Sequence, residues 1–276
     1  MEEGRGLEDK EMTFWEHLAE LSVRLRRIIG VTLLLTFIMM LIPAKLNWDD
    51  ILAVMGGDLS RYRPLVSIIL TKIREDILPP SLNPNESEIE IMSTKFANAI
   101  TIYFEGSILF ALAIASPYIA YEIYMFIAPG LYPHEKRFIK TFVGSFTGLF
   151  IIGVLYGYYI ILPITFRFLL YFSMILEVQT WFDVLDFYHI VFLGLILNGL
   201  FFTLPVFLTL AMKFGVINPE LLSGNRRYIY LGLLIFTAII TPDPTPVSMI
   251  LLSLPFILFY EIAIVIGRRV YPYESS

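Results

Sequence analysis

The sequence predicts an all-α, polytopic membrane protein, with six transmembrane helices in a kinked, concave bundle whose last two helices are short. Of the 276 residues, 57% are apolar and 16% are charged, whereas soluble domains have about 45–50% apolar and about 25% charged residues. The mean hydropathy of +0.72 agrees with this imbalance. The apolar runs are also longer than the roughly 9–11 residues of a barrel strand. These observations argue against a soluble enzyme, a disordered chain and a β-barrel.

The predicted spans form a single integral membrane domain over residues 1–276. A helix crosses roughly 30 Å of hydrocarbon with about 20 mostly apolar residues. The runs that meet or approach this length lie at about 25–44, 97–124, 140–166, 188–212, 228–242 and 247–267. The last two are short, which predicts a thinned bilayer or shielding by partner proteins; the alternative is that flanking side chains snorkel. Prolines within or near four of the spans predict kinks: Pro117, Pro163, Pro205 and Pro255.

The distribution of lysine and arginine predicts the orientation, because cytoplasmic loops carry the excess of these residues. If both termini are cytoplasmic, the inner segments hold Arg5, Lys10, Arg24, Arg26, Arg27, Lys136, Arg137, Lys140, Lys213, Arg226, Arg227, Arg268 and Arg269. The outer segments then hold Lys45, Arg61, Arg63, Lys72, Arg74, Lys95 and Arg167. The larger inner set indicates a multi-pass chain with both ends in the cytoplasm. No signal peptide is expected, since the first residues are acidic and polar.

The outer segment at about 45–95 is expected to cap the helices. Within it, Ser67–Leu78 reads as an amphipathic helix that ends at a Pro-Pro pair. The face predicted to be apolar consists of Ile68, Ile69, Ile73 and Ile77. This segment is interpreted as a packing lid without chemistry of its own.

Most enzyme classes lack support in the sequence. There are no cysteines, which excludes disulfides, thiolate metal sites and cysteine nucleophiles. The three histidines are dispersed, and no metalloprotease, P-loop or nucleophile-elbow motif occurs. We therefore expect no catalytic site, metal or cofactor, and the acidic net charge of −5 does not indicate a nucleic-acid partner. Three carboxylates near the spans, Glu105, Glu122 and Glu261, are interpreted as interfacial, so they do not form the midplane relay that a transporter needs.

Three stretches carry a more specific signal. The first is Glu16–Leu25, with the sequence EHLAELSVRL; the second runs from Ser116 through Glu122 to the loop FIAPGLYPHEKR, which ends at Arg137; the third combines Thr241-Pro242-Asp243 with Pro255 and Tyr260-Glu261-Ile262. Together they resemble TatC, the six-span core of the twin-arginine protein translocase. The resemblance covers Glu16 to Arg269.

The resemblance implies a non-enzymatic receptor that binds twin-arginine signal peptides and helps export folded proteins, driven by the proton-motive force. It implies signal-peptide binding by Glu20, Glu135, Phe126, Arg24, His17, Pro129, Lys136 and Arg137. It implies partner contacts or intramembrane polar roles for Thr203, Glu261 and Asp243. The expected partners are signal peptides of folded cargo, TatA- and TatB-type single-span subunits, further copies of the chain and the lipid of a prokaryotic cytoplasmic membrane. Carboxylates suit this task because they accept arginine in bidentate geometry.

The chain departs from the family pattern at four places. Ser22 stands where the family has arginine, Thr203 replaces an acidic or amide residue before Pro205, and Met249 replaces a glutamine. The Thr-Pro-Asp turn also aligns with a one-residue shift, which leaves the role of Asp243 open. A different interpretation of the inner carboxylates is that they are solvated and only balance neighbouring arginines. A secondary transporter of a small solute and an intramembrane hydrolase are the alternative functions.

Overall fold

The computed structural model describes residues 14–44, 56, 63–78, 91–127, 139–176, 182–240 and 246–271. Its long helices are α1 (Phe14–Leu41), α4 (Asn98–Ile127), α7 (Val184–Lys213) and α10 (Pro246–Val270). Helix α5 (Ile139–Tyr156) continues through the π-helical turn η4 (Gly157–Ile161) into α6 (Leu162–Ile175). The shorter elements are α3 (Leu65–Ile77), α8 (Pro219–Gly224), α9 (Arg226–Ile240), β1 (Ile91–Met92) and β2 (Phe182–Asp183).

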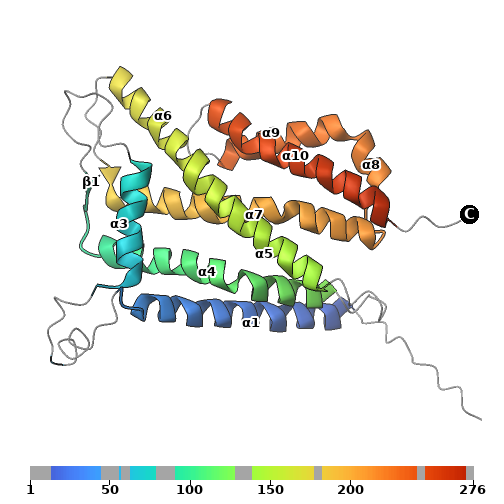
Figure 1. Ribbon diagram of the computed structural model, residues 1–276, viewed down its shortest axis with the longest axis horizontal. Coiled ribbons are helices and arrows are strands. Elements are labelled where there is room, and N and C mark those ends of the chain that lie inside the picture. Colours follow the sequence, from blue (N-terminus) through green and yellow to red (C-terminus); the bar gives the residue numbers. More distant parts are fainter. Residues whose placement is uncertain are drawn as a thin grey trace, which may run out of the picture.

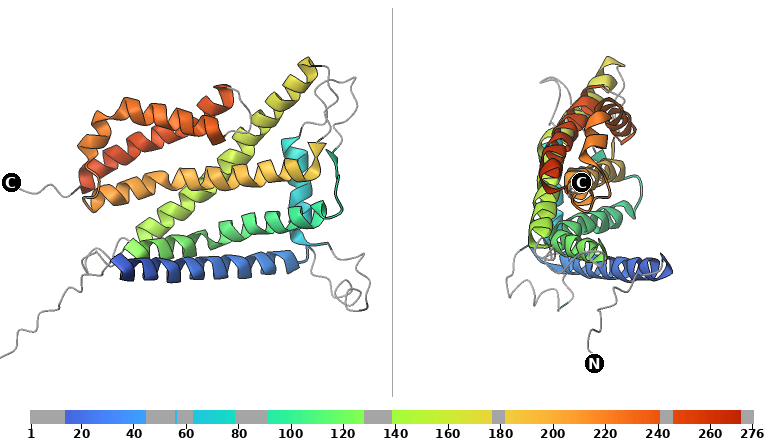
Figure 2. Two further views of the ribbon diagram at one scale, coloured as in Figure 1. Left: turned by 180° about the vertical axis from the view of Figure 1, so that it is seen from behind. Right: turned by 90° about the vertical axis from the view of Figure 1, so that its right-hand side faces the viewer.

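The helices form a flattened slab. In Figure 1, α1, α4, α7 and the α9–α10 pair lie side by side, and α5–α6 crosses them diagonally. The end-on view in Figure 2 shows α5–α6 along one broad side of the slab. Helix α3 lies across one end, which we call the lid end; α1 begins and α10 ends at the opposite end (Figure 1).

Four helical segments are long and apolar enough to cross a membrane: Asn98–Ile127, Ile139–Ser173, Val184–Lys213 and Met249–Val270. Large apolar side chains remain exposed along these helices, as expected for surfaces that face lipid. The structure thus confirms a helical, multi-pass membrane fold. Two further spans, in α1 and α9, remain predictions, because α9 has only 15 residues and the first half of α1 is charged.

Two helices differ from the sequence-based boundaries. Helix α1 begins at Phe14. The Glu16–Leu25 motif therefore belongs to the same continuous helix as the predicted first span and is not a separate segment that precedes it. Helix α10 has 25 residues, or about 37 Å, so the prediction of a short helix holds for α9 and not for α10. It continues past Glu261, whose carboxylate lies 2.8 Å from Arg226 of α9 in an ion pair.

Glycine allows α5 to cross α7 closely. A Cβ atom on Gly153 would lie 2.6 Å from the Asn198 carbonyl oxygen and 2.8 Å from the Phe202 side chain. The π-helical turn follows directly, and Pro163 begins the next turn. Three predicted prolines, at positions 117, 205 and 255, lie inside α4, α7 and α10, where each removes an intrahelical hydrogen bond.

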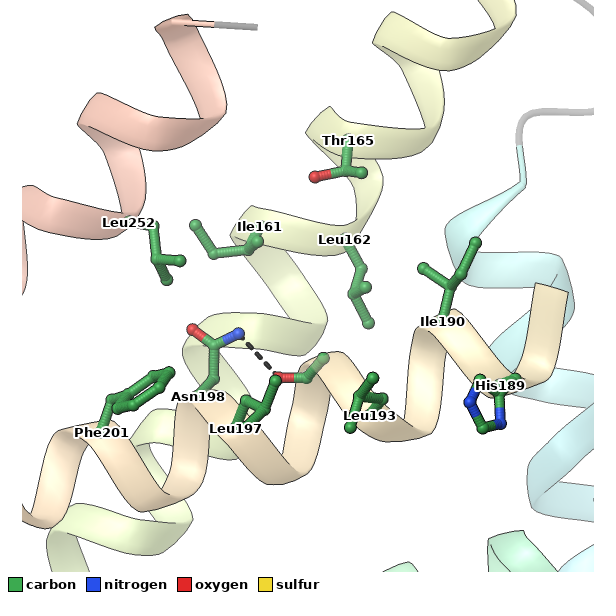
Figure 3. A pocket seen from close by; sticks show the side chains of 11 residues that line it. Ile161, Leu162, Thr165, His189, Ile190, Leu193, Leu197, Asn198, Phe201 and Leu252 are labelled. Carbon is green, nitrogen blue, oxygen red and sulfur yellow. Dashed lines mark hydrogen bonds between the residues drawn. The ribbon is translucent and has the colours of Figure 1, made fainter. Parts of the chain in front are cut away.

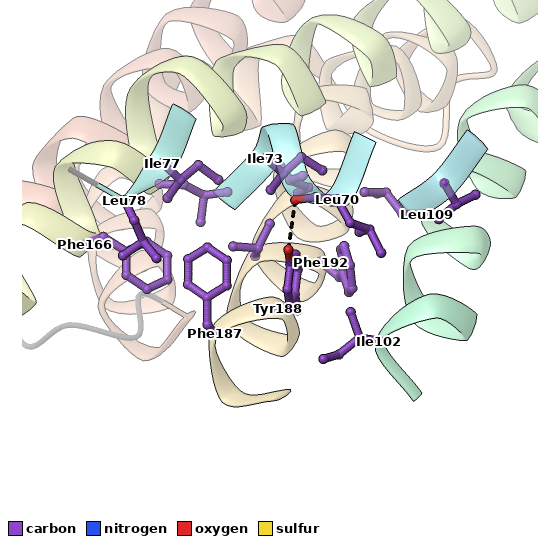
Figure 4. Close-up of a cluster of buried hydrophobic side chains, with 14 of the residues drawn as sticks. Leu70, Ile73, Ile77, Leu78, Ile102, Leu109, Phe166, Phe187, Tyr188 and Phe192 are labelled. Carbon is purple, nitrogen blue, oxygen red and sulfur yellow. Dashed lines mark hydrogen bonds between the residues drawn. The ribbon is translucent and has the colours of Figure 1, made fainter. Parts of the chain in front are cut away.

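Helix α3 is the predicted lid, but its buried face differs from the predicted one. The buried residues are Val66, Leu70, Ile73 and Ile77, spaced as one helical face. Ile68 is 47% exposed, so its assignment to the apolar face was wrong. The buried face packs on a cluster that includes Phe166 of α6 and Phe187 and Phe192 of α7 (Figure 4). Tyr188 donates a hydrogen bond of 2.8 Å to the Leu70 carbonyl and fixes the lid to α7.

A parallel two-residue pair, β1–β2, joins the chain before α4 to the start of α7. Asp183 caps α7 by accepting from the Leu185 amide at 2.8 Å, and it also accepts from Thr94 and Asn98. These bonds hold the pKa of Asp183 below its usual range, first through the Thr94 hydroxyl and then through the Leu185 amide. The pair is a small exception to the predicted all-α fold.

Candidate functional site

A stripe of polar and aromatic side chains lies along one face of α1, at the end of the molecule that is farthest from the lid. His17, Glu20, Arg24 and Arg27 are spaced by three, four and three residues, which places them on one side of a helix. Because α1 begins at Phe14, this stripe occupies its first turns. Arg24 and Glu20 are mostly buried, with side chains 15% and 19% exposed.

A second stripe lies on the facing side of α4. Tyr118, Glu122 and Phe126 follow one another at intervals of four residues in the last turns of this helix. Helices α1 and α4 pack along their length, so the two stripes meet. We call these seven residues the α1–α4 cluster.

Arg24 lies at the centre of the α1–α4 cluster. Its Nε and one terminal nitrogen donate to Glu20 Oε1 at 2.9 and 2.5 Å, and the other terminal nitrogen donates to Glu122 Oε2 at 3.0 Å. The Tyr118 hydroxyl donates to Glu122 Oε1 at 2.8 Å. Arg27 lies 3.9 Å from the same oxygen and is 59% exposed. One guanidinium therefore joins two helices whose paired residues are 98 positions apart.

The aromatic part of the α1–α4 cluster is a stacked pair. The His17 and Phe126 rings lie 4.3 Å apart between centroids, with an interplanar angle of 18°. The structure thus brings together four of the predicted signal-binding residues, His17, Glu20, Arg24 and Phe126. The aromatic stack and the largely buried ion pairs lie together where the first turns of α1 meet the last turns of α4.

Glu122 is the residue that the sequence analysis missed. It was interpreted as interfacial, but the structure buries it to 3% exposure and pairs it with Arg24. A buried carboxylate needs such a partner, because an unpaired charge in this environment is costly. Its spacing of four residues from both Tyr118 and Phe126 was the available signal.

Glu20 also differs from a solvated loop carboxylate. It pairs with Arg24, as expected for a carboxylate that balances a neighbouring arginine. However, it lies in a helix and is largely buried rather than solvated. Its second oxygen, Oε2, is buried and has no hydrogen-bond partner among the residues that the structure describes. The remaining predicted residues Pro129, Glu135, Lys136, Arg137 and Asp243 lie outside the described residues.

Thr203 and Glu261, the predicted partner contacts in the described part, both make bonds within the chain. Thr203 is 1% exposed, and its hydroxyl donates to the Leu200 carbonyl of its own helix at 2.6 Å. Glu261 accepts a hydrogen bond of 2.9 Å from Arg226 Nη2 and one from Tyr230, and its Oε1 lies 2.8 Å from Arg226 Nε in an ion pair. These contacts leave their partner roles as predictions.

A small pocket of about 90 Å³ lies between α7, the η4–α6 segment and α10 (Figure 3). Its lining is mainly aliphatic, but Asn198 and Thr165 contribute oxygen atoms from two walls. Asn198 Nδ2 donates to the Gly194 carbonyl at 2.8 Å, whereas its Oδ1 and the Thr165 hydroxyl are buried without a hydrogen-bond partner in the described part of the chain. Asn198 lies near the middle of α7, and Thr203 is not part of the lining.

The fold and the α1–α4 cluster define a multi-pass membrane protein with a preformed carboxylate–arginine site at one end of its helices. Its similarity to known proteins extends over most of the chain. Residues 16–255 match the family described as Sec-independent protein translocase protein (TatC). The chain belongs to the TatC family, and it is a component of a protein translocase rather than an enzyme.

Individual relatives agree with this assignment. The TatC protein of Aquifex aeolicus is 34% identical over 221 residues, which cover 75% of this chain and 91% of that protein. The TatC protein of Carboxydothermus hydrogenoformans is 27% identical over 98% of both chains. A crystal structure of the twin-arginine translocase receptor TatC superposes with a TM-score of 0.70 at 28% identity, and covers 92% of this chain and 99% of that one.

Proposed function

We propose that the chain is the receptor for twin-arginine signal peptides in a translocase that exports folded proteins across a prokaryotic cytoplasmic membrane with the proton-motive force. The observation that carries this proposal is the α1–α4 cluster, in which the largely buried carboxylate of Glu20 has one oxygen without a hydrogen-bond partner among the described residues. Glu20 Oε2 can accept hydrogen bonds from a guanidinium, while Glu20 Oε1 remains bound to Arg24.

The surroundings of Glu20 suit a signal peptide. The His17–Phe126 stack offers a flat aromatic surface beside the carboxylate, and arginine packs well on such faces. The loop at 128–138 follows α4 directly, so its proposed signal-binding residues Pro129, Glu135, Lys136 and Arg137 are connected to the same end of the helices. In the proposed orientation both termini and this loop face the cytoplasm, where signal peptides are presented.

The experiment compares signal-peptide binding by the unmodified chain and by Glu20→Gln. Purified chains in lipid nanodiscs are titrated with a labelled synthetic signal peptide that carries two consecutive arginines. We expect Glu20→Gln to weaken binding by at least about tenfold, since removal of one partner from a charged hydrogen-bonded pair costs 2–5 kcal/mol or roughly 30-fold and more. Glu75→Gln, on the lid helix at the other end, is the matched control. Unchanged binding by Glu20→Gln contradicts the proposal.

Single-span TatA- and TatB-type subunits are the proposed partners within the membrane. The pocket between α7, α6 and α10 supports this, because Asn198 Oδ1 lies near the middle of a spanning helix, far from lipid headgroups and water. A donor at that depth has to come from another transmembrane segment, such as a hydroxyl or amide side chain. Asn198→Leu is expected to reduce co-purification of the single-span subunits several-fold, whereas Leu204→Ala, exposed elsewhere on α7, leaves it unchanged. Equal recovery with both variants counts against this site.

A further inference from the structure

We propose that Glu122 sets the negative charge of the signal-binding site. It offsets the positive charge of Arg24, so that Glu20 still attracts an arginine of the signal peptide. This inference rests on the receptor function proposed above. It assigns to Glu122 a positioning and charge-setting role, since the contacts of this buried side chain are with Arg24, Arg27 and Tyr118.

The geometry shows why a second carboxylate matters. Arg24 directs two of its nitrogens to Glu20 Oε1, at 2.9 and 2.5 Å, and a third to Glu122 Oε2, at 3.0 Å. Glu20 alone would be neutralised by this contact. With Glu122 present, the three side chains carry one positive and two negative charges, and the sum of −1 remains available to an incoming cation.

Arg27 offsets this net negative charge less than Arg24 does. It lies 3.9 Å from Glu122 Oε1 and is 59% exposed, so water and salt screen its charge. Tyr118 donates to the same oxygen at 2.8 Å and fixes the carboxylate without adding charge. The buried pair of Arg24 and Glu122, at 15% and 4% side-chain exposure, is screened much less.

The unpaired oxygen of Glu20 points to a cationic ligand. Glu20 Oε2 is buried and has no hydrogen-bond partner among the described residues, although Oε1 on the same carboxylate accepts twice from Arg24. A guanidinium is the natural donor, because its five N–H groups can reach Oε2 and the neighbouring aromatic faces together. An ammonium has a compact charge and lacks the planar fork, so the site should favour arginine over lysine.

The test uses variants that change the charge but keep the shape. Glu122→Gln retains an oxygen that can accept a hydrogen bond from Arg24. It changes the net charge of the side chains at positions 20, 24 and 122 from −1 to zero. In full-length chains in nanodiscs, we expect it to bind the labelled Arg-Arg signal peptide about tenfold more weakly and with a smaller loss of affinity between low and high salt.

A purely structural role for Glu122 gives the opposite pattern. In that case Glu122→Gln binds the signal peptide with the same affinity and the same salt dependence as the unmodified chain, and this result overturns the inference. Glu122→Asp, which keeps the charge on a shorter side chain, should bind within about threefold; a loss as large as that of Glu122→Gln also overturns it. If Glu20→Gln loses binding while Glu122→Gln does not, only this inference fails. If Glu20→Gln binds normally, the receptor function itself fails.

Discussion

Single arginine side chains join helices of this protein that are distant in the sequence. Arg24 joins α1 to α4, and Arg226 joins α9 to α10 through one hydrogen bond and one ion-pair contact to the two oxygens of Glu261. In both pairs the planar guanidinium places more than one nitrogen against carboxylate oxygens at once, which an ammonium cannot reproduce. The short helix α9 depends on such contacts, because its 15 residues make a limited surface with α10.

Arg226→Lys is therefore expected to loosen α9, although the charge is kept. The pair is partly exposed, at 44% and 32% of its side chains, so the loss should be about 1 kcal/mol or less. Thermal unfolding in detergent, followed by circular dichroism, measures the change. Arg227→Lys is the control, because Arg227 contacts the neighbouring Tyr228 ring and hydroxyl. Equal thermal unfolding midpoints for Arg226→Lys and the unmodified chain would refute a role for the guanidinium geometry of Arg226.

At the scale of single residues, the sequence predicted part of the site. The positions of Glu20, Arg24, His17 and Phe126 came from a resemblance to a family. The structure brings these side chains together, and their role in signal binding stays a prediction. The burial of Glu122 was not predicted, because a carboxylate near a helix end is consistent with an exposed position. Only the antiparallel packing of α1 on α4 shows that Arg24 faces it, and that is a long-range contact that local spacing does not contain.

At the scale of elements, the crossing of α5 and α7 depends on glycine. The backbones approach so closely at Gly153 that a Cβ would lie 2.6 Å from a carbonyl oxygen of α7. Membrane helices lack a hydrophobic driving force between them, so close contact through small residues contributes much of their association. The crossing also places the π-helical turn η4 directly after the contact.

Gly153→Leu should separate α5 from α7 and destabilise the fold by about 1–3 kcal/mol or more, the usual cost of overpacking. The measurement is the unfolding midpoint of the purified protein in detergent. Gly148→Ala, on the same helix, is the matched control, since a Cβ there meets no atom within 4 Å and alanine favours helix. If both variants unfold at the same temperature, the close approach does not determine the packing.

For the lid helix, the apolar pattern of the sequence predicts the bounds of the helix better than it predicts which face is buried. The sequence predicted its range within about two residues, Ser67–Leu78 against the observed Leu65–Ile77. The buried face was partly misassigned, because an isoleucine-rich run fits more than one helical face. The packing against Phe187 and Phe192 of α7 selects the face through Val66 and Leu70, and this selection requires the tertiary structure.

At the scale of the whole molecule, the lid is tied to two helical segments that are distant from it in the sequence. Tyr188 of α7 donates to the Leu70 carbonyl, and Tyr158 of η4 donates to Asp76 at 2.5 Å. Separately, Asp183 accepts from Thr94 and from Asn98, the first residue of α4. The hydrogen bond from Tyr158 lowers the pKa of Asp76, and that from Thr94 lowers the pKa of Asp183. Both carboxylates are thus bound in their ionised form.

The lowered pKa of Asp76 predicts that the lid loosens in acid. Because the folded-state pKa is lowered, the stabilisation is fully present above the unfolded value of about 3.9 and is lost as the pH falls through the folded value. Hydrogen-exchange protection of residues 65–77, corrected for intrinsic rates, should therefore be constant from about pH 7 to 5 and fall below about pH 4. Asp76→Asn should lack this step, whereas Asp183→Asn, which changes a carboxylate bonded to Thr94, Asn98 and Leu185, should keep it. A step of the same size in Asp76→Asn would exclude this carboxylate as its cause.

The ends of α1 and α4 are the proposed receptor surface for the signal peptide. A photoreactive amino acid at position 126, which lies against His17 in the α1–α4 cluster, tests it directly. We expect crosslinks to an Arg-Arg signal peptide to exceed those to a matched Lys-Lys peptide several-fold, and the same probe at the exposed Ile235 of α9 to show no such preference. Equal crosslinking of both peptides at position 126 would contradict the claim.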